Sequence, residues 1–210
     1  MQVGGDYYDL LPVDGSESKL FVVIGDVSGK GLSASLYMTK LQTMMQLYCT
    51  PGKTPKEILV DVNKRMYDEI ERNWFITITL ALFDLEEGTV KFCRAGHMPI
   101  LTANNGSVEA YRTQGIGVGL EKGEIFERSL VEEEVKLNSG QIYAFFTDGV
   151  TEAMNEENEL FGEDKLTTIL KNKSAHRSTE IMEEILHSLK IFRGTAEVSD
   201  DITMVIVKVK

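Results

Sequence analysis

Four aspartates stand where apolar runs meet tight turns, and they are the residues of this chain best suited to chemistry. Asp26 and Asp148 end strand-like apolar runs, Asp200 opens one, and Asp6 follows a double glycine. Hard divalent ions such as Mg²⁺ and Mn²⁺ take oxygen ligands, and two such ions can share a water that becomes a nucleophile near neutral pH. If the four carboxylates converge at one edge of a sheet, they provide such a site.

Each aspartate, taken singly, also fits a plainer role. An Asp beside Gly commonly forms a turn or caps a helix, because its side chain hydrogen-bonds the local backbone and tolerates unusual dihedral angles. The joint occurrence of four such junctions favours metal binding over four unrelated turns.

Composition limits the class of protein. With 210 residues and 42% hydrophobic content, the chain predicts one domain, over 1–210, with a substantial core. No apolar stretch approaches the ~20 residues of a membrane span, and the N-terminus lacks the charged and apolar regions of a secretory signal, so we expect a cytoplasmic domain without membrane contact of its own. A membrane anchor in N-terminal regions of the full-length protein stays open. Cys49 and Cys93 have no metal-binding or redox spacing and are expected as buried, reduced thiols. The net charge of -11 argues against nucleic acid as a partner.

Apolar periodicity predicts the elements of the first half. A continuous apolar run over 20–24 predicts a buried strand that leads to Asp26. A helical period predicts a helix over 31–49, whose Met-rich face belongs to the core or to a surface that repacks against partners. Its apolar positions are Leu32, Leu36, Leu41, Met44, Met45 and Tyr48. A capping box at Thr54-Pro55-Lys56-Glu57 predicts a second helix over 54–72.

From Phe75 the period changes to two, which predicts hairpins. Strands are expected over 75–82 and 89–94, and Asn105-Gly106 predicts a second hairpin between 100–103 and 107–111. Further strands are expected over 125–135, 141–147 and 202–209, with helices over 163–170 and 178–192, the latter capped by Ser178. Short hairpins with paired helices indicate antiparallel sheets covered by helices.

Five motifs recur along the chain at the junctions of apolar runs and turns. They are Gly4-Gly5-Asp6-Tyr7-Tyr8-Asp9, Gly25-Asp26-Val27-Ser28-Gly29-Lys30-Gly31, Ala95-Gly96-His97-Met98-Pro99, Thr147-Asp148-Gly149-Val150-Thr151-Glu152 and Asp200-Asp201-Ile202-Thr203. In this order and spacing they closely resemble the SpoIIE-like branch of the metal-dependent protein phosphatases, bacterial relatives of protein phosphatase 2C. The resemblance runs from about residue 3 to the C-terminus.

The resemblance implies an α/β/β/α sandwich of two antiparallel sheets flanked by helices, with a binuclear Mn²⁺ or Mg²⁺ site. Carried over by position, Asp26 would bridge both metals, and Asp148 and Asp200 would hold one. Asp6 and the backbone carbonyl of Val27 would help to hold the other. A water activated by the two metals would then attack phosphoserine or phosphothreonine, with no phosphoenzyme.

One position departs from the eukaryotic pattern, where a His follows the bridging Asp by two residues; this chain has Ser28 there. The general acid is therefore unassigned, and a metal-bound water is one candidate donor. His97 is the tempting replacement, but its context is more typical of a residue that orders local backbone. Asp9 and Asp201 are expected to support the site or cap a turn. Lys30 either meets a phosphate or points to water.

The resemblance also implies the biology. Such phosphatases act on STAS-domain antagonists of anti-sigma factors in bacterial partner-switching pathways, and they follow N-terminal sensor domains, which would lie outside this sequence. We expect the helices over 31–49 and 54–72 to be levers for a sensor or a homodimer interface. Two rivals stay open: a hydrolase of a small phosphate ester, and a non-catalytic binding module with weak metal affinity.

Overall fold

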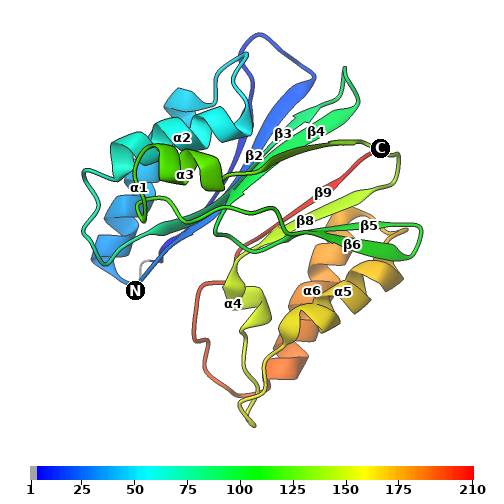
Figure 1. Ribbon diagram of the computed structural model, residues 1–210. Coiled ribbons are helices and arrows are strands. Elements are labelled where there is room, and N and C mark those ends of the chain that lie inside the picture. Colours follow the sequence, from blue (N-terminus) through cyan, green and yellow to red (C-terminus); the bar gives the residue numbers. More distant parts are fainter. Residues whose placement is uncertain (1–3) are drawn as a thin grey trace. The chain divides into compact units, whose positions relative to one another are not determined.

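The computed structural model describes residues 4–210 and divides the chain into two compact units, each built on its own sheet (Figure 1). The first unit contains residues 4–97 and 113–137, and the second contains residues 98–112 and 138–210. The single domain expected over 1–210 stays a prediction, and its first three residues lie outside the described part of the chain.

Within residues 4–97 and 113–137, the sheet of the first unit has five strands, all paired antiparallel, in the order β1-β2-β3-β4-β7. Its strands are β1 (Asp6–Pro12), β2 (Lys19–Val27), β3 (Ile76–Asp84), β4 (Thr89–Ala95) and β7 (Glu132–Lys136). The apolar run that predicted the strand over 20–24 is the buried centre of β2, which pairs on both sides. The predicted β3–β4 hairpin is confirmed.

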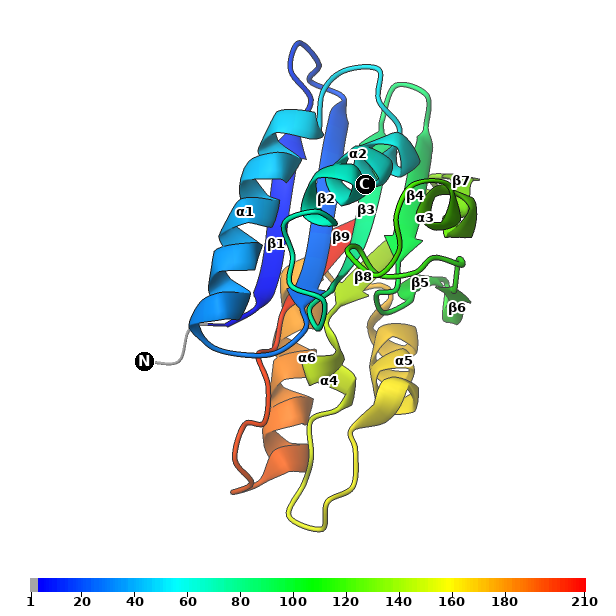
Figure 2. The ribbon, with the colours of Figure 1, turned by 60° about the vertical axis from the view of Figure 1, so that its left-hand side comes forward.

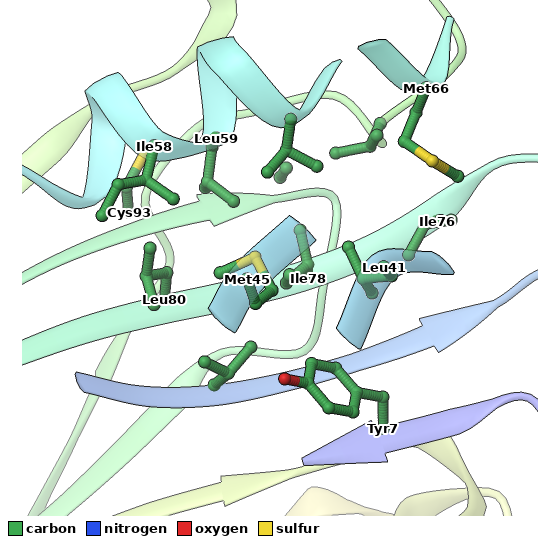
Figure 3. Close-up of a cluster of buried hydrophobic side chains, with 14 of the residues drawn as sticks. Tyr7, Leu41, Met45, Ile58, Leu59, Met66, Ile76, Ile78, Leu80 and Cys93 are labelled. Atoms are coloured by element: carbon green, nitrogen blue, oxygen red, sulfur yellow. The ribbon is translucent and has the colours of Figure 1, made fainter. Parts of the chain in front are cut away.

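Two long helices cover one face of this sheet (Figure 2). Helix α1 (Leu32–Tyr48) contacts β1 and β2, and α2 (Pro55–Met66) contacts β3 and β4. The core between them and the sheet is apolar (Figure 3); α1 supplies Leu41 and Met45, and α2 supplies Ile58, Leu59 and Met66. The predicted capping box of α2 is confirmed, with Thr54 accepting from the Glu57 N–H and Glu57 accepting from the Thr54 N–H.

The predicted apolar stripe of α1 is partly wrong. Leu32 and Leu36 are 73% and 63% exposed, whereas Ala34 and Ser35 are buried. Small residues face the sheet because the helix start lies against the β1 end: Ser35 Oγ donates to the Gly4 carbonyl at 2.9 Å. A leucine in place of Ala34 would not fit this close approach.

Two further boundaries differ from expectation. Helix α2 ends at Met66 rather than at 72, and residues 67–70 continue as turns closed by a hydrogen bond from the Ile70 N–H to the Met66 carbonyl. The strand expected over 125–135 begins only at Glu132, because Glu124–Ser129 forms a short helix, α3. That helix buries Phe126 and leaves Ile125 exposed, a one-sided pattern that alternation alone misreads as a strand.

The second unit has a four-stranded antiparallel sheet in the order β6-β5-β8-β9. Its strands are β5 (Ile100–Asn104), β6 (Ser107–Tyr111), β8 (Ile142–Phe146) and β9 (Met204–Lys208). The Asn105-Gly106 turn is confirmed, and both residues have the positive φ that a type I′ turn requires, 48° and 79°.

Three helices belong to this second unit: α4 (Asp148–Thr151), α5 (Gly162–Lys173) and α6 (Ser178–Arg193). Helix α5 packs along β5 and β6, and α6 packs along β9. The prediction that Ser178 caps α6 is wrong: Ser178 is the first residue of the helix, and the cap is Arg177, whose backbone N–H donates to Glu180. The expected fold class, mixed α/β with two antiparallel sheets and helices, is confirmed.

Among residues 4–210, no helix combines the length and the apolar character that crossing a bilayer demands.

Candidate metal-binding site

Asp6 and Asp26 are direct partners across the β1–β2 ladder of the first unit. Asp6 is the first residue of β1, and Asp26 is the last but one of β2. Residues that face each other on antiparallel strands project to the same side, with β-carbons about 4.5–5.5 Å apart, and two like charges in such a pair destabilise a sheet. A cation between the two carboxylates removes that repulsion.

Gly5 lies against the oxygens that accompany this pair. A β-carbon built on Gly5 would lie 2.9 Å from the carbonyl oxygen of Val27 and 3.2 Å from Oδ1 of Asp26. The Val27 N–H in turn donates to the Gly5 carbonyl at 3.3 Å. Any side chain at residue 5 would therefore displace the two oxygens that the family resemblance implies as metal ligands, and glycine leaves room for both.

The turn after Asp26 is fastened to the segment that precedes β3. Ser28 and Phe75 exchange two hydrogen bonds: the Phe75 N–H donates to Ser28 Oγ at 2.8 Å, and the Ser28 N–H donates to the Phe75 carbonyl at 2.9 Å. Gly29, with φ of 87°, lies against Trp74, and a β-carbon there would come within 2.9 Å of the indole ring. Lys30 is exposed in the same turn.

Asp148 and Asp200 are brought together in the second unit. Asp148 follows β8 and begins α4, and Asp200 precedes β9. The ends of these paired strands are joined through Thr147, whose N–H donates to the Thr203 carbonyl and whose Oγ1 accepts from the Thr203 N–H, both at 3.1 Å.

Gly149 lets the backbone next to Asp148 pack closely against the backbone of residues 200–201. A β-carbon there would lie 1.9 Å from the carbonyl oxygen of Asp201 and 3.6 Å from the β-carbon of Asp200. Asp200 Oδ1 also accepts from the Asp201 N–H at 3.0 Å, so Asp200 has the turn role of the plainer interpretation as well. The two roles are compatible, since a carboxylate offers about four lone-pair positions.

Each unit thus assembles two of the four aspartates. Within either unit of the described chain, no group of three or more His, Cys, Asp or Glu side chains is placed to hold a metal. The donor set itself, carboxylates with a backbone carbonyl beside Gly5, is all oxygen and fits a hard divalent cation. The complete ligand set stays a prediction.

Two of the secondary candidates, His97 and Asp9, make hydrogen bonds within the first unit. His97 is 5% exposed, its Nδ1 is 2.8 Å from Thr77 Oγ1, and its carbonyl accepts from Arg94. Asp9 lies three residues after Asp6 in β1, so the two side chains project to opposite faces of the sheet. Asp9 accepts a hydrogen bond from the Tyr7 hydroxyl at 3.1 Å. Burial, with the Asp9 charge and this hydrogen bond, raises the pKa of Tyr7 well above its usual range.

Two features of this region were missed from the sequence. One is the segment 115–119, in which Gly alternates with apolar residues. The other is Asn63, whose side-chain amide hydrogen-bonds the backbone of Gly119 and Glu121. The signal for the first was present: Gly115, Gly117 and Gly119 recur at a spacing of two, which marks close approach of backbone when it occurs outside a helix.

The architecture is that of the protein phosphatase 2C fold. The SiaA-PP2C domain of Pseudomonas aeruginosa superposes with a TM-score of 0.84 at 18% identity, over 99% of this chain and 82% of that one. The PP2C phosphatase domain of SpoIIE from Bacillus subtilis, solved with a fragment of its regulatory domain, gives 0.79 at 19% identity, over 100% and 60%.

The family model of Stage II sporulation protein E (SpoIIE) matches residues 16–210, and the chain belongs to this family. Among curated relatives, Protein IcfG of Synechocystis sp. is 26% identical over 98% of this chain and 36% of its own length. Phosphoserine phosphatase RsbU of Bacillus subtilis is 24% identical over 100% of this chain and 60% of its own. The chain therefore spans less than two thirds of the length of either relative. The expected family is confirmed.

Proposed function

We propose that this domain is a Mn²⁺- or Mg²⁺-dependent serine/threonine protein phosphatase. The observation that carries the proposal is the pairing of the aspartates: Asp6 opposite Asp26 in one unit, and Asp148 beside Asp200 in the other. Carboxylates on neighbouring residues repel each other when both are ionised, and a bound divalent cation offsets that repulsion. Membership of the SpoIIE family supports the same reaction class.

The residues that would hold two ions are those expected from the sequence. Asp26 would bridge both, Asp148 and Asp200 would hold one, and Asp6 with the Val27 carbonyl would hold the other. Bound at this site, the ions supply Lewis acidity toward the phosphoryl oxygens and lower the pKa of a shared water. Gly5 and Gly149 keep the backbone close enough for the oxygen donors of each pair to stay together.

Leaving-group protonation has no assigned side chain. Ser28 occupies the position of the His found in eukaryotic relatives, and its Oγ accepts the Phe75 N–H at 2.8 Å, which gives it a role in holding the turn. The burial of His97 and its bond to Thr77 favour a structural role for that residue too.

The substrate class is proposed from the relatives. RsbU and RsbP of Bacillus subtilis both bear the name phosphoserine phosphatase. A similar solved structure contains RsbU and RsbW domains of Rv1364c from Mycobacterium tuberculosis. We infer a phosphorylated STAS-domain protein as substrate, within a partner-switching pathway, and an N-terminal sensor domain as regulator.

A homodimer through the helices over 31–49 and 54–72 is part of the same proposal. It is supported by leucines that α1 leaves exposed, Leu32, Leu36 and Leu47, two of them one turn apart. Leu36→Ser with Leu47→Ser should shift sedimentation toward the monomer at fixed concentration. A parent chain that is already monomeric at high concentration would remove this part of the proposal alone.

The decisive experiment is hydrolysis of p-nitrophenyl phosphate with and without Mn²⁺. Asp26→Ala and Asp148→Ala should abolish the metal-dependent rate while circular dichroism shows a folded chain, and Asp14→Ala, an exposed loop substitution, serves as the control. Absence of turnover by the parent at millimolar Mn²⁺ would favour a non-catalytic module. A panel of phosphopeptides and nucleotides then separates a protein phosphatase from a hydrolase of small esters.

A further inference from the structure

Asn63 is a buried amide with both of its functional groups engaged. It lies in α2 and is 1% exposed. Its Oδ1 accepts from the Gly119 N–H at 2.8 Å, and its Nδ2 donates to the Glu121 carbonyl at 2.9 Å. Because one partner is an N–H and the other a carbonyl, only one orientation of the amide satisfies both. The side chain therefore fixes the position of the 117–121 backbone against the helix.

That backbone is bonded directly to the start of β3. The Val118 N–H donates to the Ile76 carbonyl at 2.8 Å, and the Ile76 N–H donates to the Val118 carbonyl at 2.9 Å. Gly119, with φ of 93°, lies so close to Ile70 that a β-carbon would approach it to 2.9 Å. The segment is therefore held on both sides.

The next link leads to the turn that follows Asp26. Phe75, the neighbour of Ile76, exchanges its two hydrogen bonds with Ser28, and Trp74 packs on Gly29. A series of hydrogen bonds, connected through neighbouring residues of the backbone, thus runs from Asn63, through Val118 and the start of β3, to Ser28, which directly follows Val27.

We propose that Asn63 is a positioning residue for the Asp26–Ser28 turn, and that it sets the affinity of the site for its divalent cation through the 117–121 segment. The inference rests on the proposed function. A plainer role, in which Asn63 only stabilises the fold, predicts that any comparably destabilising core substitution in α2 has the same effect on metal binding.

The test compares Asn63→Leu with Val62→Ala in the 210-residue chain. Val62 is the adjacent residue of α2; it is fully buried in the same core and makes no bond to the 117–121 segment. Mn²⁺ binding is measured by titration calorimetry, and global stability by thermal unfolding. Loss of partners outside the ligand set commonly weakens metal binding by about 10- to 100-fold. We expect a loss of about tenfold or more in Asn63→Leu, and within about twofold in Val62→Ala.

A second readout follows the turn itself. The chain has a single tryptophan, Trp74, which packs on Gly29, so acrylamide quenching of its fluorescence reports on this turn. Quenching should rise in Asn63→Leu and not in Val62→Ala. If Asn63→Leu does not fold, Ser28→Ala replaces it at the other end of the series, with Ser28→Thr, which keeps the hydroxyl, restoring Mn²⁺ affinity.

The outcomes distinguish failure of the positioning role of Asn63 from failure of the proposed phosphatase function. Equal Mn²⁺ affinity in parent and Asn63→Leu, or equal losses in Asn63→Leu and Val62→Ala, would overturn the positioning role and leave the phosphatase proposal intact. A parent chain that binds no Mn²⁺ would overturn the phosphatase proposal and the positioning role with it.

Discussion

Replacing Gly149 with alanine tests how tightly the second aspartate pair is built. Gly149 lies inside the short helix α4, with no positive φ, so backbone preference alone predicts that alanine stabilises the protein by about 0.5–1 kcal/mol. The structure predicts the opposite sign. The added β-carbon would lie 1.9 Å from the Asp201 carbonyl oxygen.

The size of the effect follows from that distance. Contacts of a β-carbon below 3.0 Å are essentially never seen, so α4 and the 200–201 backbone must separate by at least 1.1 Å, which is 3.0 minus 1.9. Overpacking of this kind costs about 1–3 kcal/mol, which outweighs the gain in helix preference. We therefore expect a net loss of about 1–2 kcal/mol in the free energy of unfolding.

Activity should fall further than stability. A misplacement of about 1 Å in a catalytic group can cost on the order of a hundredfold in rate, and Gly149 adjoins Asp148 while facing Asp200. We expect the Mn²⁺-dependent kcat/KM to drop by about that factor. Urea denaturation measures the first quantity, and hydrolysis of p-nitrophenyl phosphate measures the second.

Gly140→Ala is the matched control in the same unit. Gly140 has φ of 79° and open space around its α-carbon, so alanine there costs about 1–2 kcal/mol of backbone strain without displacing any neighbour. It should lose stability and keep its activity. A Gly149→Ala variant that is as stable as the parent, or whose activity changes no more than that of Gly140→Ala, would contradict this prediction.

Three further predictions concern parts of the fold away from the aspartates. Thr54→Ala removes the side-chain half of the α2 capping box and should lower the free energy of unfolding in urea by about 1 kcal/mol. Burial raises the pKa of the Cys49 and Cys93 thiols to about 12, with small contributions from nearby acidic charge, so both should resist iodoacetamide at pH 8 until urea unfolds the chain; rapid labelling of the native protein would contradict this. The Thr195 hydroxyl and N–H hold the pKa of Glu156 below its usual 4.5, so this carboxylate stabilises the fold above that pH and loses the effect as pH falls. The melting temperature of Glu156→Gln should accordingly lie below that of the parent at pH 7 and approach it at pH 3, whereas a gap that is constant with pH would show that Glu156 does not act through its charge.

Much of the fold could be predicted because its signals are local. The Asn105-Gly106 turn and the Thr54 capping box each depend on a few adjacent residues, and both are confirmed. The errors arise where tertiary packing decides. Leu32 and Leu36 have the right spacing for a core stripe, yet the close approach of α1 to Gly4 selects Ala34 and Ser35 for the buried side. Such an approach depends on a strand far away in sequence, and periodicity carries no trace of it.

The candidate site, like the fold, could be predicted from the sequence only in part. Aspartates at strand ends can be found from composition and spacing, because carboxylates next to apolar runs are uncommon enough to be noticed. The features that hold them are less visible, because they are absences of side chains: Gly5 leaves room for Val27 O and Asp26 Oδ1, and Gly149 leaves room for the Asp201 carbonyl. A glycine in a motif is easily assigned to a turn. Here neither residue has positive φ, so their role is close packing and not an unusual dihedral angle.

Whether a glycine is needed for close packing or for positive φ determines what its replacement by alanine affects. At a glycine with positive φ and open space around its α-carbon, such as Gly140, alanine strains only its own backbone, so the loss is local and activity survives. At Gly5 and Gly149 alanine forces neighbouring oxygens to move, and the oxygens are those of the proposed ligands or their direct neighbours. Gly5→Ala should therefore act as Gly149→Ala does, weakening Mn²⁺ binding out of proportion to stability, although the two glycines lie in different units. Parallel behaviour at two positions about 140 residues apart in sequence would be hard to explain unless both aspartate pairs serve one reaction.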